Sequence, residues 1–187
     1  MRWLIPDAAL VRKGRLAYGL SGALLIALAL VVPFLPGLLG DKIPPIGFVG
    51  SVQLWLLLWG MWACLGARAL SYQLGLSEEA LWLRYQTGQA MRISKSEVLT
   101  DGKALLARSV WIPLGVKFRH RPWAALYRQE ELQEIASCFR HVGRFELFIA
   151  GLRAKSVVCW TQVGAWIAAG ALVGASLWLC LRSVAGC

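Results

Sequence analysis

Three long stretches without a charged residue alternate with polar segments along the chain. They cover residues 16–40, 43–67 and 156–181. Because a helix rises about 1.5 Å per residue, a stretch of about 25 residues is roughly 37 Å long, which exceeds the ~30 Å hydrocarbon core of a bilayer. The pattern predicts transmembrane helices at 16–40, 47–70 and 156–181, with a short external loop at 41–50 and an external C-terminal tail at 182–187.

The segment between the second and third stretches has a period of two. Apolar side chains alternate with polar ones at residues 72–76, 81–85, 91–94 and 114–118, as they do in strands with one buried face. Turn-forming residues such as Thr100-Asp101-Gly102 separate these runs. This pattern predicts an antiparallel meander of five or more short strands.

The period changes to that of a helix over residues 129–142. Its apolar side chains share one face: Leu132, Ile135, Ala136, Phe139 and Val142. The predicted fold class is therefore α+β. Three transmembrane helices carry a small antiparallel sheet or partial barrel with a C-terminal amphipathic helix, at residues 71–143, between the second and third helices. Residues 144–155 are expected to be a basic juxtamembrane connector.

Composition and charge fit a membrane protein. The hydrophobic fraction is 58%, and ten tryptophans suit the membrane–water interface. The net charge of +10 gathers in residues 1–15 and in the polar segment, whereas the 41–50 loop holds Lys42 as its only basic residue. The positive-inside rule therefore places the basic N-terminal tail, residues 1–15, and the β domain in the cytoplasm. The need for basic residues on the cytoplasmic side of the spans also explains the basic pI better than nucleic-acid binding does.

Residues that carry chemistry form no recognisable constellation. The five cysteines include no C-x-x-C pair, and the two histidines, His120 and His141, have no cysteine or spaced carboxylate that would complete a metal site. Neither a nucleophile elbow nor a glycine-rich phosphate loop is present. The sequence therefore predicts a protein that is not an enzyme and that has no cofactor.

Two sets of residues are candidate contact sites. Lys117, Arg119 and Arg121 alternate with Phe118 and His120, so on one strand they would place three cations on one face, near an anionic membrane or partner. A solvated strand face is the alternative.

In the third apolar stretch, Gly170 and Gly174 form a small-x-x-x-small face that lets helix backbones approach closely. This face can pack against the first two helices of the same chain or against another molecule.

The polar segment resembles the bacterial pleckstrin-homology-like domains. The resemblance is carried by the Tyr72-to-Leu81 segment, in which leucines follow a Tyr-x-Leu-x-Leu-Ser pattern, by Ile112-Pro113-Leu114, and by the final short helix. In YcxB-like membrane proteins such a domain follows a two-helix membrane hairpin, and here a third span follows the domain. The resemblance implies a non-catalytic interaction domain.

We therefore expect a multi-pass protein of the inner, cytoplasmic membrane. The first hypothesis is a scaffold or accessory subunit that binds another membrane protein or assembles with copies of itself, through its domain and its transmembrane helices. The alternative hypothesis is a protein that binds or handles anionic membrane lipid through Lys117, Arg119 and Arg121. Nucleic acid is not an expected partner.

Overall fold

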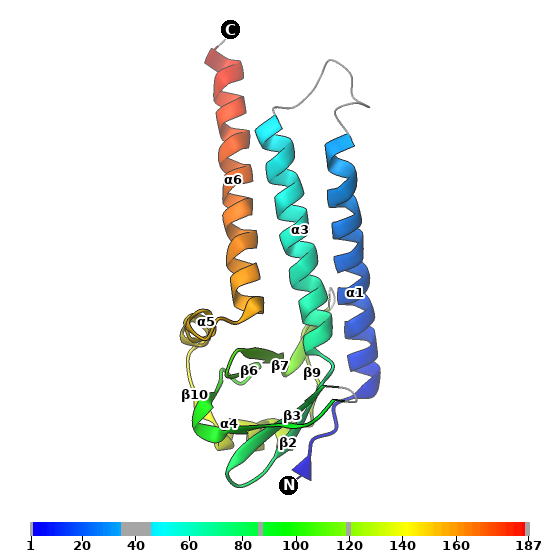
Figure 1. Ribbon diagram of the computed structural model, residues 1–187, viewed down its shortest axis with the longest axis vertical. Coiled ribbons are helices and arrows are strands. Elements are labelled where there is room, and N and C mark those ends of the chain that lie inside the picture. Colours follow the sequence, from blue (N-terminus) through cyan, green and yellow to red (C-terminus); the bar gives the residue numbers. More distant parts are fainter. Residues whose placement is uncertain (1, 35–45, 86–87, 119–120, 186–187) are drawn as a thin grey trace. The chain divides into compact units, whose positions relative to one another are not determined.

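The chain folds into two compact units (Figure 1). The computed structural model describes residues 2–34, 46–85, 88–118 and 121–185. Unit 1 comprises Met1–Tyr18 and Leu65–Cys159, and unit 2 comprises Gly19–Cys64 and Trp160–Cys187. The N-terminal segment and one end of each of the three long helices therefore belong to the same unit as the polar segment.

The first sheet of unit 1 has four antiparallel strands. In spatial order they are β1 (Arg2–Trp3), β2 (Tyr72–Leu76), β3 (Ala80–Tyr85) and β4 (Met91–Ser94). Leu74 pairs with Leu83, and Leu81 pairs with Ile93, and all four side chains are buried. The predicted alternation thus forms this sheet. Strand β1 adds an edge from the segment that we expected to be a tail.

A second four-stranded sheet has the order β10-β5-β6-β7. Strand β10 runs parallel to β5, and the other pairs are antiparallel. A separate antiparallel pair joins β8 to β9. The bounds are β5 (Val98–Thr100), β6 (Ala104–Ala107), β7 (Val110–Pro113), β8 (Gly115–Phe118), β9 (Arg121–Ala125) and β10 (Arg140–His141).

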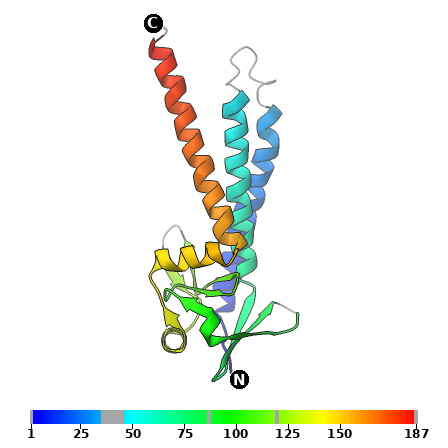
Figure 2. The same ribbon diagram turned by 60° about the vertical axis from the view of Figure 1, so that its left-hand side comes forward.

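Two helices complete unit 1, α4 (Gln129–Cys138) and α5 (Arg144–Arg153). Helix α4 covers the core with Ile135, which is fully buried among the leucines of the sheets. It ends earlier than predicted, because Phe139 adopts an extended conformation and the chain then enters β10. Helix α5 lies against β6 (Figure 2), in the segment that we expected to be a connector.

Three long helices carry the apolar stretches: α1 (Ala8–Val31), α3 (Ile46–Ala69) and α6 (Val157–Ala185). A short 3-10 helix, Val32–Phe34, continues α1. Within the described residues, these three helices are long and apolar enough to cross a membrane. This confirms the predicted number of candidate spans.

Close backbone packing joins the helices of unit 2. A Cβ added at Gly22 of α1 would lie 2.8 Å from the Gly60 carbonyl oxygen of α3, so both positions need glycine. On α3, Trp59 makes an edge-on contact with Trp166 of α6, with ring centroids 6.0 Å apart. Glycine and aromatic side chains thus set the helix contacts of this unit.

The α+β class with small sheets is confirmed, and the sheets form no closed barrel over the described residues. Within the segment expected to be a basic tail, Arg2–Trp3 form β1 and α1 begins at Ala8. Helix α6 continues to Ala185. Residues 41–45 of the expected loop lie outside the described residues, and residues 46–50 belong to α3. The pleckstrin-homology-like identity of the domain stays a prediction.

Candidate functional site

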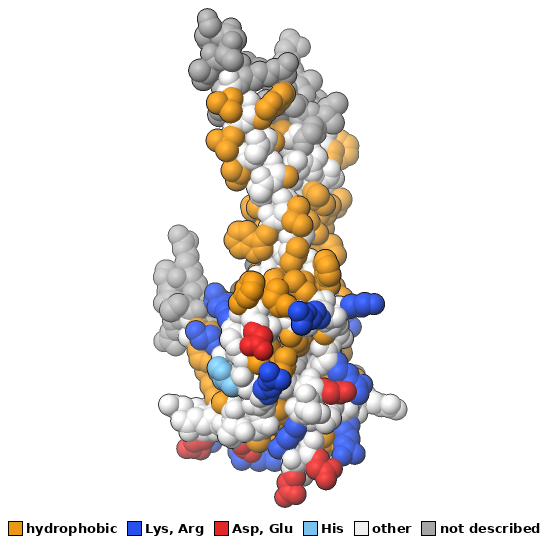
Figure 3. Space-filling view, turned by 90° about the vertical axis from the view of Figure 1, so that its left-hand side faces the viewer, with side chains coloured by type: hydrophobic (Ala, Val, Ile, Leu, Met, Phe, Trp, Pro, Cys, Tyr) orange, Lys and Arg blue, Asp and Glu red, His pale blue; other side chains and the backbone are white. Residues whose placement is uncertain are grey.

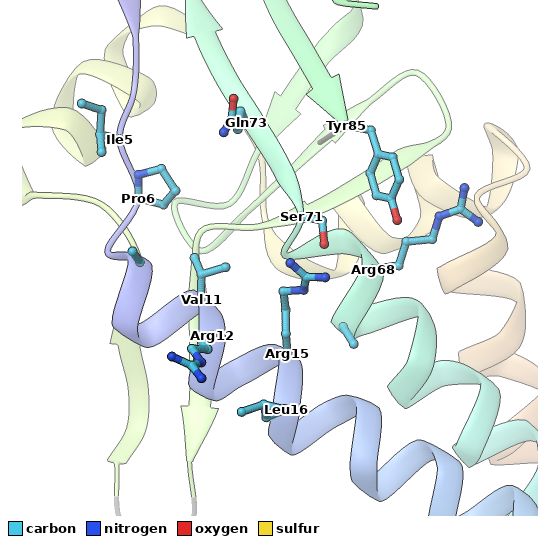
Figure 4. A pocket seen from close by; sticks show the side chains of 12 residues that line it. Ile5, Pro6, Val11, Arg12, Arg15, Leu16, Arg68, Ser71, Gln73 and Tyr85 are labelled. Carbon is cyan, nitrogen blue, oxygen red and sulfur yellow. The ribbon is translucent and has the colours of Figure 1, made fainter. Parts of the chain in front are cut away.

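An open cavity of about 720 Å³ lies in unit 1. Three arginines line it, and we call it the arginine cavity (Figure 4). One wall is the N-terminal segment with the first turns of α1, and the other is the end of α3 with β2 and β3. The lining residues are Ile5, Pro6, Ala8, Val11, Arg12, Arg15, Leu16, Ala67, Arg68, Ser71, Gln73 and Tyr85.

Helical spacing brings two of the arginines to the same wall. Residues three and four apart share one face of a helix, and the lining residues of α1 follow this spacing from Ala8 through Arg12 and Arg15 to Leu16. The Asp7 carboxylate caps this helix by accepting the Ala9 and Leu10 backbone N–H groups at 2.9 and 3.0 Å.

The other side of α1 fixes the helix to the domain. Gly14 approaches the core so closely that an added Cβ would lie 2.9 Å from Leu70 Cδ1 and 3.1 Å from Val116 Cγ1. Before the helix begins, the Asp7 N–H donates to the Leu126 carbonyl at 2.7 Å. These contacts set the rotation of α1, so Arg12 and Arg15 are held on the cavity side.

The opposite wall contributes Arg68 from the last turn of α3. Its Cζ lies 5.2 Å from the centroid of the Tyr85 ring, and the Tyr85 ring contacts that of Tyr72. A cation over an aromatic face is stabilised by the ring quadrupole. The stacking therefore fixes this long side chain beside the Tyr85 ring, and its charged end lies on the side of Tyr85 that faces away from Arg15 (Figure 4).

Gln73 forms part of the β2 wall, and a neighbouring arginine fixes its orientation. Arg84 donates from Nε and Nη2 to Gln73 Oε1, at 3.0 and 2.6 Å. The same guanidinium lies 4.6 Å from the centroid of the Trp3 ring. Because Oε1 is already engaged, the Gln73 amide presents N–H donors rather than an acceptor to further partners.

The cavity is electropositive. Its lining includes no aspartate or glutamate. Within the described part of the chain, Arg12, Arg15 and Arg68 make no ion pair, whereas Arg2, Arg92, Arg108 and Arg140 each pair with a glutamate. Three arginines without an ion pair are among the residues that line this cavity. Their positive charges attract an anion, and the planar fork of a guanidinium matches carboxylate and phosphate oxygens.

All three arginines stand at ends of apolar stretches. Arg12 and Arg15 precede the uncharged run that begins at Leu16, and Arg68 follows the run that ends at Ala67. Arginines at such positions extend their charged ends to the headgroup level of a bilayer. The sequence positions thus place the cavity where lipid headgroups lie, if the two helices cross a membrane.

The lining lacks a catalytic pair. Ser71 and Tyr85 carry hydroxyl groups, but no histidine or carboxylate accompanies them in the cavity to act as a base. Over the residues that the structure describes, no group of three histidine, cysteine, aspartate or glutamate side chains is arranged to hold a metal ion. Binding of an anion is therefore the chemistry that the residues of this cavity support.

The basic residues chosen from the sequence do not share one strand. Lys117 is exposed on β8, and Arg121 is the first residue of β9, where it pairs with Phe118. Arg119 lies outside the described residues. Because β8 ends at Phe118 and the antiparallel strand β9 begins at Arg121, Lys117 and Arg121 do not lie on one continuous strand as expected. Lys117 does not line the arginine cavity, and a role of these residues in lipid binding stays a prediction.

Gly170 and Gly174 of α6 also differ from one of the expected arrangements. An added Cβ at either residue would meet no described atom within 4 Å, so this face does not pack against α1 or α3. Gly164, six residues earlier than Gly170, approaches Leu58 instead, with the Cβ position 3.3 Å from Leu58 Cδ1. The Gly170–Gly174 face is open in the described structure.

Sequence reasoning missed the arginine cavity. The basic residues of the N-terminal segment, among them Arg12 and Arg15, entered only as topology signals, and Arg68 entered no candidate site. The spacing of Arg12 and Arg15 was an available signal for a shared face, but their proximity to Arg68 depends on tertiary packing. Comparisons of the chain with protein-family models, curated protein sequences and solved structures found no match.

Proposed function

We propose that this protein is a multi-pass membrane protein that binds an anionic phospholipid headgroup in the arginine cavity. One observation carries the proposal: three arginine residues from the ends of two candidate spans line a single cavity that has no aspartate or glutamate among its lining residues. This is the lipid-binding alternative expected from the sequence, at different residues. No reaction is part of the proposal.

The lining suits both parts of a lipid. Arg12, Arg15 and Arg68 provide charged donors for the phosphate, and Ser71 and Gln73 add neutral donors for headgroup oxygens. Ile5, Pro6, Val11 and Leu16 supply apolar surface for the glycerol and the first acyl carbons. Each cation near an anionic surface contributes about 1 kcal/mol, so three contribute about 3 kcal/mol, or roughly a 100-fold gain in affinity.

The charge distribution supports a cytoplasmic location for the cavity in an inner membrane. Arg2, Arg12, Lys13 and Arg15 precede the first apolar stretch, whereas Lys42 is the single basic residue of the first connecting loop. By the positive-inside rule, the N-terminus and unit 1 face the cytoplasm. That leaflet surface carries anionic lipid.

Native mass spectrometry of the full chain in detergent tests the proposal with a short-chain phosphatidylglycerol as the probe. We expect the triple variant Arg12→Gln, Arg15→Gln, Arg68→Gln to bind it roughly 100-fold more weakly than the wild type. The matched control is Lys13→Gln, Lys95→Gln, Lys103→Gln, which removes three lysine charges outside the cavity. Equal losses in the two triple variants would show that general surface charge, not the cavity, holds the lipid.

A second candidate function is assembly with another copy or another membrane protein through α6. The open face at Gly170 and Gly174 favours it, since close-packing positions elsewhere, such as Gly22 and Gly60, are already occupied. Gly170→Leu with Gly174→Leu is expected to lower the particle mass in mild detergent. Gly19→Leu with Gly50→Leu is the control, because these glycines are also open. An unchanged mass in the first variant contradicts this function.

A further inference from the structure

Helix α5 has two apolar faces, and unit 1 uses one of them. We propose that the second face rests in the headgroup region of the bilayer, so that α5 is an in-plane membrane-surface helix. The lipid surface is its partner. The proposed contact shares no residue with the arginine cavity and stands independently of it.

The inner face of α5 packs against the second sheet. Leu147 is fully buried in a cluster with Ala104, Leu106 and Val142. One turn later, Gly151 is so closely packed that an added Cβ would lie 2.5 Å from Cys159 Sγ. These contacts fix the rotation of the helix about its axis.

The outer face carries four large apolar side chains at helical spacing. Phe145, Phe148, Ile149 and Leu152 occupy positions i, i+3, i+4 and i+7, which lie on one side of a helix. Phe145 is 77% exposed, and the other three are only half-buried. A face of this kind on a helix that already buries Leu147 on another side marks a contact surface.

The chain itself keeps this surface near the membrane. Helix α5 ends at Arg153, and the candidate span begins at Val157, so three residues connect them and reach at most roughly 10 Å. The turn is tight: Lys155 N–H donates to the Leu152 carbonyl at 3.0 Å, and Ser156 N–H donates to the Gly151 carbonyl at 2.9 Å. The C-terminal end of α5 therefore cannot leave the interface.

Charge complementarity favours lipid over a protein partner. Arg144, Arg153 and Lys155 flank the outer face and are exposed, and Glu146 is the acidic residue of the helix, 3.9 Å from Arg140. Hydrophobic side chains lie beside lysine and arginine side chains on this part of unit 1 (Figure 3). An apolar face bordered by cations is the composition of helices that lie in the plane of anionic membranes.

Photo-crosslinking of the full chain in vesicles of phosphatidylethanolamine and phosphatidylglycerol tests this placement. Benzoylphenylalanine replaces Phe145 or Ile149 in separate variants. Ser137, exposed on α4, is the water-facing control, and Ile167, 68% exposed on α6, is the lipid-facing control. We expect Phe145 and Ile149 to give roughly tenfold more lipid adduct than Ser137, measured by intact mass.

Lipid adducts at both outer positions support the proposal. Adduct levels no higher than at Ser137, in chains whose Ile167 variant does crosslink to lipid, overturn it, because the protein is then inserted and α5 faces water. A crosslink from Phe145 to a second polypeptide also overturns it, since the occupant is then another copy. Using two outer positions guards against one substitution disturbing the helix.

Discussion

Gly22 of α1 and Gly60 of α3 lie backbone to backbone, with the Cβ position of each within 3.0 Å of the carbonyl oxygen of the other. Cys64, one turn beyond Gly60, also approaches Gly22. Such contacts replace the hydrophobic effect as the source of helix association in lipid, because lipid tails are as apolar as the side chains. The pair therefore determines how the first two long helices meet.

Enlarging either glycine is expected to destabilise unit 2. Gly22→Leu or Gly60→Leu forces the backbones apart and lowers the free energy of unfolding by about 1–3 kcal/mol. Gly19→Leu, at an open position of α1, is the control and should change it by less than about 0.5 kcal/mol. Unfolding by SDS in mixed micelles measures both. Similar losses at Gly22 and Gly19 would contradict the observed packing.

Salt is expected to weaken the proposed lipid contact in the arginine cavity. The cavity is open, and raising the ionic strength from 0.1 M to 1 M shortens the Debye length from about 10 Å to about 3 Å. Affinity for short-chain phosphatidylglycerol should fall roughly tenfold, and affinity for phosphatidylcholine should stay constant. The variant with Arg12, Arg15 and Arg68 changed to glutamine should lose this salt dependence. A triple variant whose lipid affinity still falls with salt would show that charges outside the cavity bind the lipid.

Arg84 is expected to stabilise the N-terminal strand through the shape of its side chain. Its guanidinium bonds to Gln73 Oε1 twice and stacks on Trp3 of β1. Arg84→Lys keeps the charge but loses the planar fork, so the free energy of unfolding should fall by about 1–2 kcal/mol. Arg92→Lys, in an exposed pair with Glu79, should cost less than about 0.5 kcal/mol. Thermal unfolding in detergent measures both, and equal effects would refute the prediction.

Tyr127 is expected to make the protein less stable in strong alkali. Burial raises the pKa of Tyr127 above its ordinary value of 10.0, and the nearby Glu131 carboxylate adds to the rise. The unfolded chain therefore releases this proton first as the pH rises above about 10, and the free energy of unfolding falls from there upward.

Tyr127→Phe removes this contribution. The variant should match the wild type at pH 7 and become the more stable of the two above pH 10 or so, by an increasing margin. Denaturant titrations at several pH values measure the difference. A margin that does not change with pH would show that Tyr127 does not titrate differently in the two states.

Element types were predictable wherever one local period dominated. The alternation at residues 72–76 buries Leu74 and Leu76, and these residues are β2. The parallel strand Arg140–His141 was missed, because two residues carry no detectable period and its partner, Leu99 to Thr100, is remote in sequence. Helix α5 was not predicted, because its apolar residues lie on two faces and so do not give the single helical period of an amphipathic helix.

The sequence by itself determined the three apolar helices, the polar segment between the second and third, and the excess of basic charge at one end of the spans. Those features follow from length, hydropathy and charge, which act locally. Only the tertiary structure decided that Arg68 lies near Arg12 and Arg15, and that Gly170 stays open while Gly60 is packed. These facts depend on close packing between segments that are distant in the sequence, such as Gly14 against Leu70 and Val116 or Gly60 against Gly22. Such packing leaves no periodic pattern in either segment.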